Sequence, residues 1–354
     1  MSLYFSEKYA SLTPYTPGEQ PQKRGYVKLN TNESPFSPSP YAIKAAYDEL
    51  KRMELYPDPN CTSLIRALSA FYGLDENCFI ATNGSDETLY FAFLAYCDSK
   101  TPAVFADITY GFYKVFARLT NTEYREIPLK EDFTLDPEDY YGAKATVFIA
   151  NPNAPTGIAL KKNEIEKIIQ RNQNNIVVVD EAYVDFGAES CIDLVKKYEN
   201  LLVVRTFSKS RSMAGARLGF GVGNPELIKD LNTIRFSTNP YNINRMTLAA
   251  GVGALTDREY FYNCLNVIVE NRVDTAERLK HLGFEMTDSS ANFLFVKHPQ
   301  ISGLELYEKL KAAGVLIRHF EAPRISDYNR ITIGTSEQIN VPIKNIEAIL
   351  EEQA

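Results

Sequence analysis

Short apolar runs alternate with helical patterns between about residue 40 and residue 245. The runs are rich in β-branched and aromatic residues and read "CFIAT", "AVFAD", "TVFIA", "NIVVVD" and "LLVVRTF". Amphipathic segments such as "KKNEIEKIIQRN" separate them. Continuously apolar strands are typical of a sheet that is covered on both faces. The pattern therefore predicts an α/β fold of three layers, with a mostly parallel sheet between two layers of helices.

The pattern changes after about residue 250. A long amphipathic helix is expected over residues 256–281, followed by a strand in "ANFLFVKH", a helix in "GLELYEKLKAAG" and strands in "GVLIRHF" and "NRITIGT". We therefore expect a small α+β domain over residues 251–354, beside a large domain over residues 36–250. Residues 1–35 hold four prolines and little periodicity, which predicts an extended N-terminal arm that packs with the small domain.

Composition and charge exclude several classes of protein. The 354 residues carry a net charge of −7 with a pI near 5.3, whereas a nucleic-acid-binding domain normally has a basic face. No apolar run approaches the ~20 residues of a membrane helix, and the first residues lack the apolar core of a secretory signal, so we expect a cytoplasmic protein. Five dispersed cysteines and three isolated histidines predict neither disulfides nor a metal site.

Candidate chemistry lies just after the predicted strands, because ligands of parallel sheets bind beyond the carboxyl ends of the strands. In "NGSDE", Ser85 is expected to cap a helix whose first turn, with Asp86, cradles an anion such as phosphate. An ordinary helix start would carry the same residues. Tyr110 either stacks on a planar ligand or joins the core. Asn153, in the loop "NPNAPTG", either donates to a ligand oxygen or belongs to a simple turn.

Asp180 is the acidic residue whose position most needs an explanation. It follows a run of apolar residues and is expected to be buried, where a carboxylate is unfavourable without a cationic partner. No basic residue is adjacent in the sequence, so a protonated ring nitrogen of a ligand would supply that partner. Tyr183, three residues further on, would bond to the same ring.

The segment "VVRTFSKSRSMAGARLGFG" brings an amine, hydroxyls and a guanidinium to the end of the last strand of this series. Thr206 and Ser208 precede Lys209, and Arg217 offers a fork that suits a phosphate. A surface lysine is the alternative, but a desolvated lysine near other cations is nucleophilic. An amine, a buried carboxylate, a stacking aromatic ring and a phosphate cup together predict a pyridoxal 5'-phosphate site, with Lys209 as the partner of the cofactor aldehyde.

With these motifs in order, the chain resembles the fold-type-I pyridoxal-phosphate enzymes of the aminotransferase class I/II superfamily, and within it the histidinol-phosphate aminotransferase branch. The resemblance covers nearly the whole chain and rests on "LTPYTPG", "VKLNTNESPFSPSP", "LYPDPNCTSLIRALSAFYGL", "NGSDE", "DEAYVDF", "RTFSKSRSMAGARLGFG" and "NRITIGT". It implies a homodimeric transaminase of histidine biosynthesis that acts on L-histidinol phosphate and 2-oxoglutarate, with pyridoxal 5'-phosphate as cofactor.

The resemblance also implies roles for single residues at the cofactor. Lys209 would hold the cofactor covalently and shuttle the proton, Asp180 would pair with the ring nitrogen, and Tyr183 would contact the ring oxygen. Tyr110 would stack on the ring. The phosphate cup would consist of Ser85, Asp86, Thr206, Ser208 and Arg217, joined by Tyr56 of the partner subunit.

Three residues are implied on the substrate side, and one position departs from the family. Arg330 would hold the carboxylate of the amino donor, while Tyr15 and Arg318 would lie near the substrate phosphate, although Arg318 also fits an ordinary surface charge. The Asn that the family places before the loop proline is Ala154 here. Asn153 would then have to replace its contact to the ring oxygen, or the contact is lost.

Three other functions share parts of this pattern. An aromatic amino-acid aminotransferase would differ in the amino acceptors that it uses. A threonine-phosphate decarboxylase would release carbon dioxide without a keto acid. A ligand-sensing half of a transcription regulator is disfavoured because the chain is acidic and no DNA-binding segment is expected.

Overall fold

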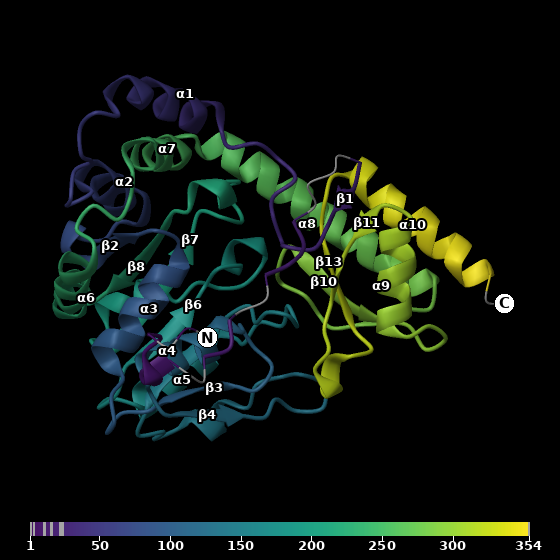
Figure 1. Cartoon of the computed structure of the whole chain (residues 1–354), viewed down its shortest axis with the longest axis horizontal. Helices are drawn as coiled ribbons and strands as arrows, with labels where there is room; N and C mark the ends of the chain where they lie inside the picture. The colour runs from purple at the N-terminus through teal and green to yellow at the C-terminus, as the bar shows by residue number, and fades with distance from the viewer. Residues whose placement is uncertain (1, 3, 10–11, 15–16, 21–24, 353–354) are drawn as a thin grey trace.

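The computed structural model describes residues 2, 4–9, 12–14, 17–20 and 25–352. Within that part of the chain the largest sheet has seven strands, in the order β2-β8-β7-β6-β5-β3-β4 (Figure 1). β8 is antiparallel to both of its neighbours, and the remaining pairs are parallel. The strands are β2 (Phe79–Thr82), β3 (Ala103–Ala106), β4 (Tyr124–Ile127), β5 (Thr146–Ala150), β6 (Val177–Asp180), β7 (Leu201–Thr206) and β8 (Gly219–Gly223).

Alternate side chains of these strands enter two separate apolar cores. In β5, Val147 and Ile149 pack on the side of α2, α5 and α7, whereas Phe148 packs on the side of α3, α4 and α6. The predicted α/β fold with helices on both faces of the sheet is therefore confirmed. The helices of this large lobe are α1 (Pro40–Glu49), α2 (Thr62–Tyr72), α3 (Ser85–Tyr96), α4 (Phe112–Thr120), α5 (Lys162–Arg171), α6 (Pro225–Thr238) and α7 (Arg245–Thr256).

Two strands of the large sheet were not expected from the hydrophobic pattern. β4 reads YREI and is only partly buried at the edge of the sheet. β8 reads GFGVG, and glycine weakens the signal of a strand. Close packing nevertheless requires glycine at position 219, because a methyl group there would lie 2.4 Å from the backbone nitrogen of Ser85.

The C-terminal part of the chain forms a smaller α+β lobe. A sheet in the order β12-β13-β10-β9 packs against helices α8, α9 and α10 around its own core, and α8 leads into this lobe from the large one (Figure 1). The elements are α8 (Arg258–His281), β9 (Glu285–Met286), β10 (Phe293–Lys297), α9 (Gly303–Ala312), β11 (Val315–Leu316), β12 (Arg318–His319), β13 (Asn329–Thr332) and α10 (Ser336–Glu351).

An N-terminal segment lies against the small lobe before the chain enters the large one. β1 (Val27–Lys28) pairs in parallel with β11, and the backbone N–H of Thr332 donates to the carbonyl oxygen of Leu29 at 2.9 Å. At the other end of the large lobe, Leu255 of α7 belongs to the large core, so the expected boundary at residue 250 falls inside α7. None of the described helices is long and apolar enough to cross a membrane.

Candidate active site

A cavity of about 350 Å³ lies at the carboxyl ends of β5, β6 and β7, and Gln20, Thr31 and Glu33 from the N-terminal segment line it as well. Its walls bring together nine of the predicted site residues from separate parts of the sequence. These are Ser85, Asp86, Tyr110, Asp180, Tyr183, Thr206, Ser208, Lys209 and Arg217.

Lys209 follows β7 and is half-buried in the wall of the cavity. Its Nζ donates a hydrogen bond to the carbonyl oxygen of Thr31 at 3.1 Å and lies 5.7 Å from the centre of the Tyr183 ring. Both of these contacts are with uncharged groups, whereas Glu33, whose direct ion pair is with Lys28, is near enough for the Lys209 charge to help lower its pKa. The segment after β1, which carries Thr31, therefore lies against the Lys209 amine.

Asp180 is the last residue of β6 and is 5% exposed. The hydroxyl of Tyr113 donates to its Oδ2 at 3.0 Å and the N–H of Ala182 to its Oδ1 at 3.2 Å. Burial raises the pKa of Asp180 to about 7, and these two hydrogen bonds offset only part of that effect. In the described part of the chain no cation pairs with this carboxylate. A protonated ring nitrogen would supply the missing charge, so Asp180 fits the predicted cofactor.

Tyr183 is fixed on two sides. Its hydroxyl accepts a hydrogen bond from Nδ2 of Asn32 at 2.9 Å, and its ring meets Phe293 of β10 edge-on at a centroid distance of 5.1 Å. The backbone N–H of Asn32 in turn donates to the hydroxyl of Thr332 in β13 at 3.0 Å. The tyrosine is therefore linked through Asn32 to the small lobe.

Asn32 and Tyr113 are site-supporting residues that were not predicted. Tyr113 stands three residues after Tyr110, and its backbone N–H donates to the Tyr110 carbonyl oxygen at 3.1 Å in the turn that leads into α4. This spacing is the signal that could have paired them. Asn32 lies in the quoted motif "VKLNTNESPFSPSP" and has a left-handed backbone with φ of 56°, a conformation that Asn tolerates better than most residues. Its partner Tyr183 is 151 positions away, which the local sequence could not indicate.

The start of α3 differs from the prediction in one detail. Gly84, with φ of 81°, is the N-cap residue, so the prediction that Ser85 caps the helix is wrong. Ser85 is instead the first helical residue and lines the cavity. The hydroxyls of Thr206 and Ser208 lie 2.9 Å apart nearby. Hydroxyls at the positive end of a helix form a surface that fits a phosphate group.

Asp86 connects the predicted phosphate cup to the stacking ring. Its Oδ1 accepts from the hydroxyl of Tyr110 at 2.6 Å, and its Oδ2 accepts from Nη2 of Arg217 at 3.2 Å. Burial and the nearby Asp86 raise the pKa of Tyr110 well above its usual value, so this hydroxyl stays a donor. Because a carboxylate repels a phosphate, this geometry suits Asp86 to holding Tyr110 and Arg217 in place rather than to touching the phosphate.

The structure does not bring Asn153 into the cavity. Its Nδ2 donates to the carbonyl oxygen of Ile108 at 2.9 Å and to Thr156 Oγ1 at 3.0 Å, while its Oδ1 accepts from Thr109 Oγ1 at 2.7 Å. It lines a separate small cavity of about 80 Å³, and Ala154 lines the large one. A contact from Asn153 to a cofactor would require these bonds to break, so the side chain expected to replace the missing Asn is already engaged elsewhere.

The predicted substrate-side arginines lie on two paired strands of the small lobe. Arg318 of β12 and Arg330 of β13 are directly opposite each other, and each guanidinium lies 5.8 Å from the Phe320 ring. Nη2 of Arg330 donates to the carbonyl oxygen of Asn30 at 3.1 Å. Two guanidinium groups on facing strands suit the binding of an anion. Tyr15 lies outside the described residues.

Tyr56 is also remote from the cavity of its own chain. Its side chain is 78% exposed and stacks on Tyr241 at a centroid distance of 4.6 Å. It does not line the cavity walls described above. That Tyr56 contacts the cofactor of a partner subunit stays a prediction.

Replacing Gly219 by alanine is expected to weaken cofactor binding by about tenfold or more, because the added methyl group would push the start of α3 away from β8. Titration of the apoprotein with pyridoxal phosphate, followed by visible absorbance, measures this affinity. Gly223→Ala at the far end of the same strand is the control, since its methyl group would lie 3.3 Å from the nearest atom, the Leu201 carbonyl oxygen. Equal affinities of both variants would contradict the close-packing argument.

Fold and site together define an enzyme that uses pyridoxal phosphate on a large α/β lobe with a smaller second lobe. The chain belongs to the aminotransferase class I and II family, whose pattern matches residues 24–346. It is therefore a pyridoxal-phosphate-dependent aminotransferase, as predicted from the sequence.

Relatives with similar sequences carry a more specific name. The chain is 46% identical to a histidinol-phosphate aminotransferase of Brachyspira hyodysenteriae, over 99% of this chain and 100% of that protein. It is 47% identical to a histidinol-phosphate aminotransferase of a Marinomonas species, over 96% and 97% of the two chains.

Solved structures show how widely the fold is shared. A histidinol-phosphate aminotransferase of Sinorhizobium meliloti, in complex with pyridoxal 5'-phosphate, superposes with a TM-score of 0.91 at 23% identity and covers 100% of this chain and 99% of that one. An L-threonine-O-3-phosphate decarboxylase of Porphyromonas gingivalis superposes with a TM-score of 0.80 at 24% identity, over 92% and 99%. The fold alone therefore does not select the reaction.

Proposed function

We propose that this aminotransferase transfers the amino group between L-histidinol phosphate and 2-oxoglutarate, giving imidazole acetol phosphate and glutamate in histidine biosynthesis. The observation that carries the proposal is the 46% identity with a histidinol-phosphate aminotransferase over essentially both chains. The arginine pair Arg318 and Arg330 supports it, because both substrates are anions: one carries a phosphate and the other carries carboxylates.

The residues around the cavity have different roles at the cofactor. When bound, pyridoxal phosphate withdraws electrons from the substrate carbon that carries the amino group. Lys209 holds the cofactor, and it removes and returns the proton at that carbon. Asp180 keeps a proton on the ring nitrogen through its negative charge. Tyr183, held by Asn32, donates to the ring oxygen.

Further residues bind the phosphate, the ring face and the substrates. Tyr110 stacks on the ring, with its hydroxyl held by Asp86. On the substrate side, Arg330 binds the carboxylate of glutamate, and Arg318 and Tyr15 bind the phosphate of histidinol phosphate. The cofactor phosphate is bound by Ser85, Thr206, Ser208 and Arg217.

A homodimer is part of the proposal. Large apolar side chains are exposed along α1 and the segment that follows it, among them Tyr41, Tyr47, Met53, Leu55 and Tyr56. Exposed apolar groups of this size that lie close together in the sequence are typical of a protein interface. We propose that a second copy of the chain covers them, and that Tyr56 of the partner subunit reaches the phosphate cup. The cytoplasmic location expected from the sequence stays a prediction.

Mixing chains that carry Tyr56→Ala with chains that carry Lys209→Ala is expected to restore activity. Random pairing makes half of the dimers hybrids, and each hybrid has one native site, so the mixture should recover up to about a quarter of the wild-type rate. The assay uses a limiting concentration of pyridoxal phosphate, because the loss of Tyr56 lowers the cofactor occupancy most under that condition. A mixture no more active than the average of its two parents would show that Tyr56 does not act across an interface.

The substrate assignment is tested with the absorbance spectrum of the purified holoenzyme. L-glutamate and L-histidinol phosphate, added separately, are each expected to convert the visible band of the lysine-bound cofactor to a shorter-wavelength amine form. If only histidinol phosphate fails to do so, the aminotransferase assignment stands and its substrate is another amino compound. Profiling of aromatic amino acids then tests the aminotransferase alternative. If neither compound converts the band, carbon dioxide release from threonine phosphate tests the decarboxylase alternative.

A further inference from the structure

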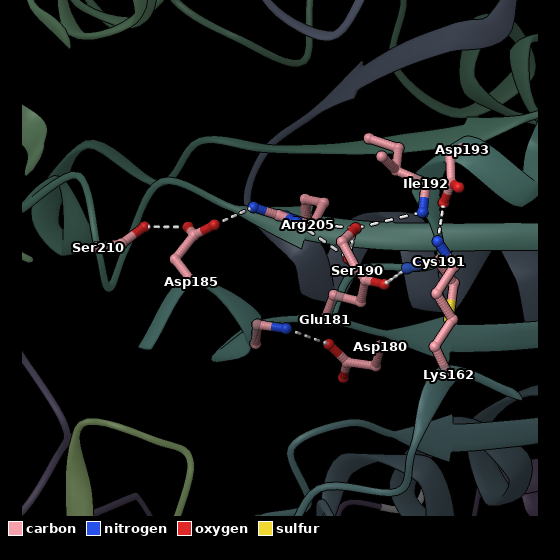
Figure 2. A network of polar contacts seen from close by, with 11 residues as sticks. Lys162, Asp180, Glu181, Asp185, Ser190, Cys191, Ile192, Asp193, Arg205 and Ser210 are labelled. Atoms are coloured by element: carbon pink, nitrogen blue, oxygen red, sulfur yellow. Dashed lines mark hydrogen bonds and ion pairs between the residues drawn. The ribbon is translucent and has the colours of Figure 1, made fainter. Parts of the chain in front are cut away.

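A buried charge network lies beside the active site (Figure 2). Nη1 of Arg205 donates to Glu181 Oε2 at 2.9 Å, and Nη2 donates to Asp185 Oδ1 at 2.5 Å. The side chains of Arg205 and Glu181 are 6% and 0% exposed. The hydroxyl of Ser190 donates to Glu181 at 2.6 Å, and that of Ser210 donates to Asp185 at 2.5 Å. The network therefore has a Ser190 end and a Ser210 end, which Arg205 joins.

Arg205 points to the face of the sheet opposite to the cavity residues Asp180 and Thr206. Those two residues follow the alternation of Val178 and Val204. Adjacent residues of a strand point to opposite faces, and in β7 Arg205 follows the alternation of Val203, which packs on the α2 side. Its guanidinium lies 5.8 Å from the ring of Tyr72, the last residue of α2. Network and site residues are neighbours in the sequence, in the pairs Glu181 and Asp180, Arg205 and Thr206, and Ser210 and Lys209.

Asp185 is the acceptor that links the lysine loop to β7. Burial raises the pKa of its carboxyl, but the charge of Arg205 and the hydroxyl of Ser210 outweigh burial and lower the pKa overall. Asp185 is therefore a carboxylate that accepts from both neighbours at once. Two short charge-assisted hydrogen bonds to a carboxylate whose side chain is only 23% exposed restrict the groups that they join.

The loop that carries Lys209 has further anchors after Ser210, because Nη1 of Arg211 donates to the carbonyl oxygen of Ala254 at 2.8 Å and the hydroxyl of Ser212 donates to Ser34 Oγ at 2.8 Å. Ser210 is the anchor adjacent to Lys209. Among the described residues the amine donates a hydrogen bond to the Thr31 carbonyl oxygen, contacts the Tyr183 ring and interacts electrostatically with Glu33. A reacting group must be held within a fraction of an ångström of its productive position. Ser210, adjacent in the chain, is bonded to Asp185, which is in turn paired with the buried Arg205.

We propose that Ser210 is a positioning residue for Lys209: its hydrogen bond to Asp185 fixes the lysine loop to β7 through Arg205. This role goes beyond the choice of substrate and would serve any reaction at this cofactor. It predicts that removing the Ser210 hydroxyl, which does not itself line the cavity, changes the geometry in which Lys209 holds the cofactor.

The test compares Ser210→Ala with Ser190→Ala, which removes a hydroxyl from the other end of the same network. Both holoenzymes are examined by circular dichroism in the visible band, divided by the absorbance of the bound cofactor, and by thermal unfolding. We expect the Ser210→Ala signal to change by about twofold, because the signal depends on how the cofactor is twisted at the lysine. The Ser190→Ala signal should stay at the wild-type value, even if both variants lose similar stability. Ser210→Thr, which keeps the hydroxyl, should restore the wild-type signal.

A wild-type signal in Ser210→Ala, or equal changes in both alanine variants, would overturn the proposal and leave Ser210 a merely structural residue. If Ser210→Ala does not fold, Ser210→Cys keeps the size of the side chain with a much weaker donor and decides by the same signal. Neither the circular dichroism measurement nor the thermal unfolding measurement needs a substrate. Failure of the proposed reaction would therefore appear in the substrate spectra and not in this experiment.

Discussion

Replacing Lys209 by alanine is expected to abolish transamination and to leave the fold intact. The variant loses both the amine that holds the cofactor and the group that moves the proton, so the rate should fall by about 10⁴-fold or more. The half-buried side chain makes one hydrogen bond, to Thr31, whose loss changes stability by only about 1 kcal/mol. Product formation at saturating cofactor measures the first effect, and thermal unfolding of the apoprotein measures the second.

Lys209→Arg is the matched control for the charge of this residue. Arginine keeps a cation that can donate to the Thr31 carbonyl oxygen, but it has no free amine for the cofactor aldehyde. It should therefore be as inactive as the alanine variant. Activity within tenfold of wild type in either variant would remove Lys209 from the mechanism.

Replacing Asp180 by asparagine is expected to have opposite effects on catalysis and on the stability of the apoprotein. In the holoenzyme the variant loses the negative charge that holds a proton on the ring nitrogen, so the rate should fall by about 10²-fold or more. In the apoprotein the carboxylate is buried without a cation, and its pKa is raised to about 7. Asparagine keeps an acceptor for Tyr113 and removes the unfavourable charge.

The sign of the stability effect follows from proton binding. Between the unfolded pKa of 3.8 and the folded pKa of about 7, the folded wild type binds more protons at Asp180 than the unfolded chain does, so its stability falls as the pH rises. The difference between Asp180→Asn and wild type should therefore grow by about 2 kcal/mol from pH 5.5 to pH 8 and then level off. Urea unfolding of both apoproteins at one protein concentration measures it.

A stability difference that does not depend on pH would mean that Asp180 is not the buried, unpaired acid described here. Tyr113→Phe is a useful comparison, because it leaves the carboxylate and removes one of its two hydrogen bonds. That variant should steepen the loss of apoprotein stability with pH, since the charged form of Asp180 would be held less well.

The parts of the site that could be predicted follow from strand geometry. Asp180 and Lys209 each follow an apolar run, and parallel strands place their carboxyl ends at one edge of the sheet. The arrangement at that edge could therefore be inferred without knowing which residues touch. The same argument located Tyr110, which lies where the polypeptide leaves β3.

The parts that could not be predicted depend on contacts between distant residues. Asn153 had the right chemistry, but its three hydrogen bonds to neighbouring loops turn it away from the cavity. β8 was missed because its glycines give no apolar signal, although Gly219 has to pack against the backbone at the start of α3. Asn32 reaches Tyr183 only because the N-terminal segment folds back over the site.

That segment also affects the order in which the protein can be assembled on the ribosome. The backbone N–H of Asn32 donates a hydrogen bond to Thr332, 300 positions later in the chain. Strand β1 pairs with β11. The large lobe, with Asp180 and Lys209, is complete long before either partner emerges, because synthesis proceeds at only about 5–20 residues per second. β1 and Asn32 are therefore made before the large lobe but meet their partners only after it has been synthesised.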